Sequence, residues 1–148
     1  MKPLVIASIL SVAVVGAAAA QTATNGQAAA GADPVMTRDG TRYACTGIGA
    51  ESRTDPRWSG FPAKLVFAAS DGGYLSQVAT RIADGQGNTV FEVQDCGPWL
   101  LLDLPTGRYT VNATAHDGQG RNYESRATMT VGAGGQTETV VRFPDLAG

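Results

Sequence analysis

The sequence predicts an all-β fold, a two-layer antiparallel β-sandwich of about seven strands. Three observations favour it. Short runs in which apolar and polar residues alternate, as they do in strands with one buried face, recur between residues 63 and 143. Glycine, proline, asparagine and aspartate cluster between these runs, at the spacing of turns in a sandwich. No stretch of any length shows the period of a helix.

The clearest strand signal lies in residues 99–115. Residues 99–104 form a nearly continuous apolar run of strand length, which predicts burial on both faces. Pro105 and Gly107 then mark a tight turn, because proline presets φ at the first corner and glycine tolerates a positive φ. Over residues 108–116 the odd-numbered positions are apolar and the even-numbered ones polar, so we expect the odd positions to face the core. We predict a hairpin across this stretch.

The remaining strands follow from the same alternation and turn signals. We expect them over residues 41–50 (a short strand or an extended arm), 63–69, 76–83, 89–94, 122–131 and 137–143. Leu65 should face the core, and Val78, Thr80 and Ile82 should share one face of their strand. The faces taken by the side chains of the 89–94 strand stay open. Asp84-Gly85 should close a hairpin, since glycine supplies the positive φ that such a turn needs. Two prolines and a glycine in the stretch before residue 63 exclude a long helix there.

The first forty residues divide into a leader and a tail. A lysine near the start, an apolar run over 4–15 and small residues ending at Ala20 predict a secretory signal peptide over residues 1–20. A membrane anchor is the alternative, and it would need roughly 20 apolar residues with polar flanks. Residues 21–40 lack any periodicity, so we expect a disordered tail before a sandwich over residues 41–148. A second alanine run over 28–30 leaves the cleavage point open.

Cys45 and Cys96 are the only two cysteines, and in an exported protein an even number predicts a disulfide. Their bond would close a loop of about 50 residues and contribute roughly 3–4 kcal/mol on the chain-entropy model. A metal site would need more ligands, and the single histidine, His116, lies at a predicted polar position. The spacing also differs from the C-x-x-C of redox enzymes. We therefore expect a structural disulfide, no metal and no cofactor, in a periplasmic or secreted protein.

A series of glycine, proline and aromatic positions recurs in a recognisable order. These positions are Gly73-Tyr74-Leu75-Ser76, Val78, Ile82, Gly87, Asp95-x-Gly97-x-Trp99 and Leu104-Pro105-x-Gly107-x-Tyr109-x-Val111-x-Ala113. Over residues 62–143 the pattern resembles the carboxypeptidase regulatory-like domains, in particular small periplasmic bacterial proteins that carry this domain alone. The resemblance implies a transthyretin-like or immunoglobulin-like sandwich and no particular activity, because this fold hosts many roles.

The length, the net charge and the apolar runs of the sequence limit the number of domains and the kinds of partner that we expect. The 148 residues suffice for one domain, and the net charge of -2 offers no basic excess for nucleic acid. No second apolar run follows the leader, so we expect no membrane insertion after its removal.

Glu92, Asp95 and Asp103 are more typical of solvated strand ends than of a glycosidase pair. His116 has no recognisable nucleophile or acid partner, so we predict that the protein is not an enzyme.

Three aromatic residues are candidates for ligand binding: Trp58, Tyr74 and Trp99. Aromatic rings on a sandwich surface can stack on sugars. The alternative, which we favour, is that Trp99 fills the core beside the disulfide, Trp58 caps a sheet edge and Tyr74 is a core or edge aromatic. The sequence thus predicts a non-enzymatic exported module that mediates an interaction with a protein or a cell-envelope component. A carbohydrate-binding module that uses surface aromatics is the alternative, with an envelope glycan as partner.

Overall fold

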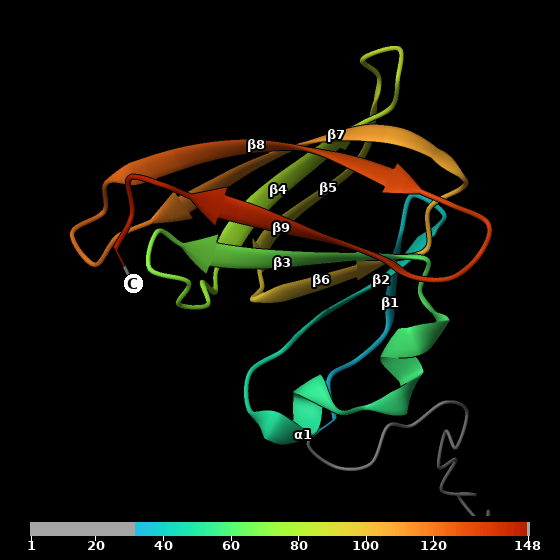
Figure 1. The fold of residues 1–148 in the computed structure, drawn as a ribbon, viewed down its shortest axis with the longest axis horizontal. Coiled ribbons are helices and arrows are strands. Elements are labelled where there is room, and N and C mark those ends of the chain that lie inside the picture. The colour runs from blue at the N-terminus through green and yellow to red at the C-terminus, as the bar shows by residue number, and fades with distance from the viewer. Residues whose placement is uncertain (1–31, 148) are drawn as a thin grey trace, which may run out of the picture.

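Nine strands form two sheets that stack face to face, as Figure 1 shows for the computed structural model, which describes residues 32–147. This arrangement confirms the predicted all-β sandwich. The predicted leader and residues 21–31 of the predicted tail lie outside the described residues. Helices within the described range are short, and none of them has both the length and the apolar character of a membrane span.

The five-stranded sheet has the order β1-β2-β6-β3-β9. Its strands are β1 (Met36–Arg38), β2 (Thr41–Thr46), β6 (Trp99–Leu102), β3 (Ala63–Ala69) and β9 (Thr137–Phe143). β3 and β9 run parallel, with Ala63 opposite Thr137, and this pair departs from the predicted antiparallel arrangement. The two strands come from distant parts of the chain, so the connection is long enough to bring β9 back to the end at which β3 starts.

The four-stranded sheet has the order β5-β4-β7-β8 and is antiparallel throughout. Its strands are β4 (Val78–Ala83), β5 (Thr89–Cys96), β7 (Gly107–His116) and β8 (Asn122–Val131). All four agree with predicted strands to within a few residues at each end. The sheet holds two hairpins, β4–β5 and β7–β8, which pair across short turns.

Residues before Thr41 belong to the fold. β1 lies at the edge of the five-stranded sheet, with Met36 opposite Tyr43. The Asp33 carboxylate accepts a 2.6 Å hydrogen bond from the Thr46 hydroxyl. The sandwich therefore begins before the predicted residue 41, and the prediction of a disordered tail is wrong for residues 33–40. A strand of three residues is too short for alternation to reveal it.

The predicted hairpin over residues 99–115 does not form, because β6 and β7 lie in different sheets. β6 has β2 on one side and β3 on the other, so neither of its edges is free to pair with β7. The connection through Pro105 instead crosses between the sheets. The Tyr109 hydroxyl donates a 2.6 Å hydrogen bond to the Pro105 carbonyl, the arrangement known in sandwiches as a tyrosine corner.

Both hairpins of the four-stranded sheet close with the same Asp-Gly-Gln-Gly sequence. The Asp84 carboxylate accepts hydrogen bonds from two later backbone N–H groups in the turn, and Asp117 does the same in the second hairpin. The positive φ lies at Gly87 and Gly120, at 85° and 81°, and not at the glycine directly after the aspartate. The prediction of a hairpin is confirmed, but the second glycine of each turn takes the left-handed conformation.

The main core lies between the two sheets and follows the predicted alternation. In β7 the odd-numbered residues from Tyr109 to Ala115 are buried, and the even-numbered ones lie outward. Leu65 is buried as expected, and the face shared by Val78, Thr80 and Ile82 is the buried one. Phe91 faces inward, which answers the open question for the 89–94 strand. Each sheet thus buries one face, which stabilises the sandwich through loss of apolar surface to water.

A second apolar cluster covers the other face of the five-stranded sheet. The covering segment, residues 47–62, contains the helix α1 (Ala50–Arg53) and the 3-10 helix η1 (Pro56–Gly60), and no long helix forms there, as predicted. The buried members of the cluster are Ala44, Trp58, Phe61, Val66, Trp99 and Leu101. β6 therefore has apolar neighbours on both sides, which confirms the burial predicted for the run that starts at residue 99.

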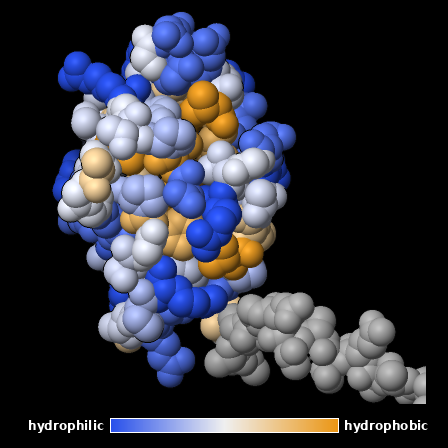
Figure 2. Space-filling view, turned by 90° about the vertical axis from the view of Figure 1, so that its right-hand side faces the viewer, coloured by the Kyte–Doolittle hydropathy of each residue, from blue (hydrophilic) through white to orange (hydrophobic). Residues whose placement is uncertain are grey.

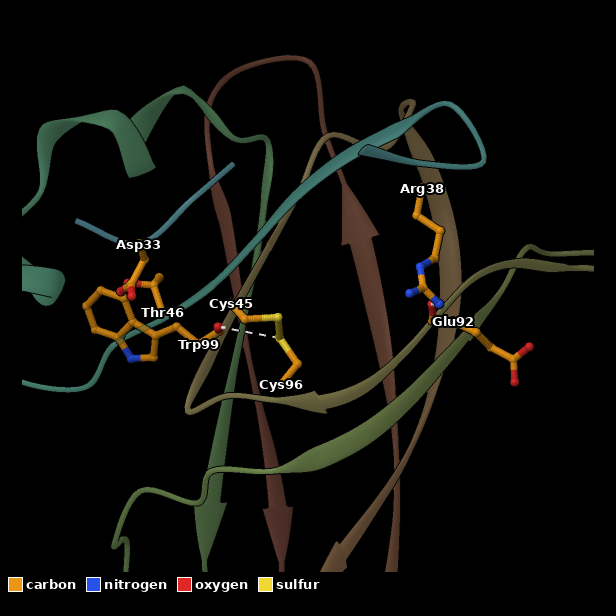
Figure 3. The surroundings of a disulfide bond; sticks show 7 residues. All are labelled: Asp33, Arg38, Cys45, Thr46, Glu92, Cys96 and Trp99. Atoms are coloured by element: carbon orange, nitrogen blue, oxygen red, sulfur yellow. Dashed lines mark hydrogen bonds between the residues drawn. A yellow bond between two sulfur atoms is a disulfide. The ribbon is translucent and has the colours of Figure 1, made fainter. Parts of the chain in front are cut away.

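The disulfide between Cys45 and Cys96 links β2 of the five-stranded sheet to the end of β5 in the other sheet (Figure 3), with 5.2 Å between the Cα atoms. The predicted pairing is confirmed. Arg38 supports the same side, since its guanidinium donates a 3.2 Å hydrogen bond to the Glu92 carbonyl. On the opposite side β8 lies beside β9, and the Ser125 hydroxyl donates to the carbonyl of residue 142 across 2.6 Å. The two sheets are therefore linked to each other along both sides of the sandwich.

Candidate functional site

Two of the three predicted ligand-binding aromatics are buried. Trp58 is 4% exposed and Trp99 9% exposed, and both belong to the cluster beneath the covering segment. The Trp58 indole N–H donates a 2.6 Å hydrogen bond to the Ser52 carbonyl, which joins η1 to α1 within the covering segment. Neither ring offers an open face to a sugar. The expectation that Trp99 fills the core also needs correction, because its side chain packs in the second cluster, on the outer face of the five-stranded sheet, and not in the main core.

Trp99 is enclosed from several directions. The Lys64 ammonium lies 3.4 Å from the centre of its ring and also pairs with Glu138 at 2.9 Å. The backbone of Gly47 packs so closely that a Cβ atom there would lie 2.8 Å from Cγ of the indole. The indole N–H is buried without a hydrogen-bond partner in the described part of the chain. These contacts give Trp99 a structural role beneath the covering segment.

Tyr74 is the one accessible member of the three, at 55% exposure. The Arg53 guanidinium lies 5.7 Å from the centre of its ring, in a cation–π arrangement. The opposite end of the molecule, at which β3 and β9 begin, has its apolar areas broken up by polar and charged side chains (Figure 2). Because the rings of Trp58 and Trp99 are buried, the three residues do not form the stacking platform of several aromatics that a sugar-binding surface of the predicted kind requires.

The outer face of the four-stranded sheet carries a different set of functional groups. The polar positions of β7 lie outward because its apolar positions fill the core. Strand register then places Arg81 and Arg126 on either side of Asn112, with Glu92 next to Arg81 on β5. One polar row thus runs across all four strands. The sequence contained each of these residues, but their alignment depends on strand neighbours that local patterns do not specify.

A recess lies on this face, next to the β4–β5 turn. Its volume is about 560 Å³, and the polar side chains that line it include Arg81, Arg108, Thr110, Asn112, Arg126 and Thr128. Two smaller hollows of about 330 and 370 Å³ continue along the same face. We call the largest of these the arginine recess. It is open and polar, so it suits a ligand that makes many hydrogen bonds better than one that needs an apolar cavity.

Charge is unevenly distributed over this face. Arg81 pairs with Glu92 at 2.9 Å. Arg108 and Arg126 both line the arginine recess, and neither forms an ion pair with another described residue. Glu124 lies one row away, opposite Thr114, where it lines the smaller hollows. The recess is thus lined by three arginines and one carboxylate, that of Asp84, whereas glutamates accompany the arginines of the adjoining hollows.

Two aspartates have lowered pKa values, and both accept hydrogen bonds from nearby residues in a turn or at the start of a short helix. The pKa of Asp117 falls to about 2, chiefly because the backbone N–H of Arg121 donates to its carboxylate. The pKa of Asp55 is lowered by its hydrogen bonds from Arg57. His116 lies 2.6 Å from the Asn122 side-chain oxygen on the surface. Within residues 32–147, no three histidine, cysteine or acidic side chains gather as metal ligands would.

Comparison of the chain with protein-family models, with curated proteins and with solved structures finds no match.

Proposed function

We propose that this protein is a non-enzymatic module of the periplasm or extracellular space that binds a cell-envelope component through the outer face of its four-stranded sheet. The observation that carries the proposal is the arginine recess and the polar row that crosses it, Glu92–Arg81–Asn112–Arg126. Export is supported by the predicted leader and by the disulfide, since disulfides persist in oxidising compartments. The resemblance to carboxypeptidase regulatory-like domains supports the same setting.

The composition of this face favours a glycan over a protein as the ligand. Protein interfaces depend on buried aromatic and apolar anchors at their centre. The exposed large apolar residues in the described part of the chain are Ile48, Tyr74 and Val140, and all three lie outside the four-stranded sheet. Amide, hydroxyl and guanidinium groups line the face instead. Amide and hydroxyl groups both donate hydrogen bonds to sugar hydroxyls and accept them, and guanidinium groups donate them.

Sedimentation with washed bacterial envelope fragments tests this proposal. Asn112→Met places a neutral chain without hydrogen-bonding groups at the centre of the polar row. Thr37→Met makes a similar change at an exposed position in β1 of the other sheet and serves as the control. We expect the wild type and the control to pellet with the fragments, and Asn112→Met to bind about tenfold more weakly, equivalent to roughly 1.4 kcal/mol. Equal pelleting of both variants, or no pelleting of the wild type, contradicts the proposal.

A protein partner is the second candidate, and exposed Tyr74 with Arg53 above its ring is the observation that favours it. Tyrosine and arginine are enriched at protein interfaces. In this case Tyr74→Ala should abolish capture of a periplasmic protein that the wild type and Asn112→Met both retain. Capture that is unaffected by Tyr74→Ala argues against this surface.

A further inference from the structure

We propose that the ligand of the arginine recess is an acidic polysaccharide, whose carboxylate or sulfate groups bind between Arg108 and Arg126. The inference rests on the function proposed for this face and specifies the chemistry of its ligand. It comes from the arrangement of charge in and beside the recess, which is separate from the polarity that favours a glycan.

The arginines of the recess come from adjacent strands. Arg126 on β8 lies directly opposite Asn112 on β7, and Arg81 on β4 lies on the other side of the same asparagine. Arg108 and Asn112 are four residues apart on β7. A strand rises about 3.4 Å per residue and neighbouring strands are about 4.8 Å apart, so the Cα atoms of Arg108 and Arg126 are roughly 14 Å apart. Arg108 points outward from the same strand as Asn112, nearer the β4–β5 turn. Guanidinium groups at such spacing can bind successive anionic groups of an extended chain.

Two of these arginines are available to a ligand. Arg81 already pairs with Glu92, and both side chains are about half exposed, at 61% and 47%. Arg108 and Arg126 are exposed, and no carboxylate of the described residues pairs with either. An anion that binds them therefore replaces water and not an internal partner. The whole chain has a net charge of -2, so attraction of a polyanion depends on this local cluster.

The groups between the arginines suit the sugar ring. Thr110 lies opposite Thr128, one row from Asn112, and all three line the recess. Their hydroxyl and amide groups can donate to and accept from sugar hydroxyls. The recess offers no apolar pocket for the side chains of an acidic peptide, which makes a carboxylated or sulfated sugar the better match.

Glu124 restricts where the charged groups of the ligand can lie on this face. It lies two residues before Arg126 on β8 and points to the same side of the sheet. Its carboxylate repels an anion, and so does that of Asp84 at the β4–β5 turn, so the charged groups of the ligand should lie between them, over Arg108 and Arg126. Removal of the Glu124 carboxylate should therefore strengthen binding, whereas removal of either free arginine should weaken it.

Calorimetry with defined polymers tests the inference. The probes are polygalacturonate, chondroitin sulfate, uncharged dextran and poly-glutamate. The variants are Arg108→Gln, Arg126→Gln and Glu124→Gln, with Arg42→Gln as a control that removes the same charge from the five-stranded sheet. At least one acidic polysaccharide should bind, and its affinity should fall about tenfold in each recess arginine variant. Glu124→Gln should bind about threefold more tightly, Arg42→Gln should match the wild type, and added salt should weaken binding.

Three binding results would overturn the inference, and so would absence of binding to every polymer. Dextran could bind as tightly as polygalacturonate, poly-glutamate could bind as tightly as either acidic polysaccharide, or Arg126→Gln could match Arg42→Gln. If dextran binds as tightly as polygalacturonate and Asn112→Met still loses binding to envelope fragments, the acidic ligand is excluded but the proposed function is supported. If no polymer binds but sedimentation with envelope fragments still depends on Asn112, the acidic ligand is likewise excluded while the proposed function is supported.

Discussion

Tyr109 and Pro105 are joined by a 2.6 Å hydrogen bond from the phenol hydroxyl to the proline carbonyl. Pro105 lies in the connection that carries the chain from the five-stranded sheet to the four-stranded sheet, and Tyr109 is buried near the start of β7. The bond therefore fixes the corner at which the chain changes layers. It also gives that carbonyl a partner where no strand is adjacent to it.

Loss of this bond should destabilise the fold. Tyr109→Phe keeps the ring and removes the hydroxyl, so we expect the free energy of unfolding to fall by about 1 kcal/mol. Urea denaturation measures the change. Tyr123→Phe is the matched control, because its hydroxyl bonds to Asp117 in a hairpin at the surface and should matter less. A larger loss in the control than in Tyr109→Phe would contradict the role of the corner.

The disulfide should contribute more than any single hydrogen bond. Cys45 and Cys96 are 51 residues apart and close one side of the sandwich, so replacing both with alanine should cost roughly 2–4 kcal/mol. Reduction of the wild type should produce the same loss in a denaturation experiment. Mass spectrometry of exported protein alkylated without reductant should show no added label, and labelling of both thiols would refute the bond.

Alanine substitutions at Gly47 and Gly49 should distinguish the cost of backbone strain from the cost of a steric clash. Both have a positive φ, at 99° and 85°, so alanine should cost about 1 kcal/mol at either position. Only at Gly47 would the new Cβ meet the Trp99 ring, at 2.8 Å. We expect Gly47→Ala to destabilise by about 1–3 kcal/mol more than Gly49→Ala, as measured by thermal unfolding. Equal losses would show that the covering segment is free to move away from Trp99.

The low pKa of Asp117 predicts how stability depends on pH. The folded pKa of about 2 lies below the ordinary 3.8, so the stabilising effect of this carboxylate is present above pH 3.8 and is lost as the pH falls toward 2. Asp117→Asn keeps an acceptor oxygen but has no such transition. The difference in melting temperature between the two proteins should be constant near neutral pH and should shrink in acid. A difference that persists unchanged at pH 2 would indicate another cause.

Local patterns were enough to predict most strands and the faces of their side chains. The alternation from Tyr109 to Ala115 fixed which side of β7 is buried, because a strand with one wet face repeats every two residues. The pairing of Cys45 with Cys96 followed from their number alone. These features depend on neighbours in sequence or on simple counting, and neither requires knowledge of which strands meet.

Features set by distant contacts could not be predicted in this way. Burial of Trp58 and Trp99 depends on the covering segment, which has no periodic pattern and folds back over the five-stranded sheet. The separation of β6 from β7 depends on β2 and β3 occupying both edges of β6. The arginine recess likewise depends on a register that brings Arg81 and Arg126 beside Asn112.

The parallel pairing of β3 with β9 has a consequence for how the protein is made. Ala63 meets Thr137, so one edge of β3 must wait for a strand that is synthesised much later. The β4–β5 and β7–β8 hairpins, in contrast, can close as soon as their own turns emerge. An unpaired strand edge readily joins another chain. Until the final strand is made, this edge of β3 therefore stays open to intermolecular pairing.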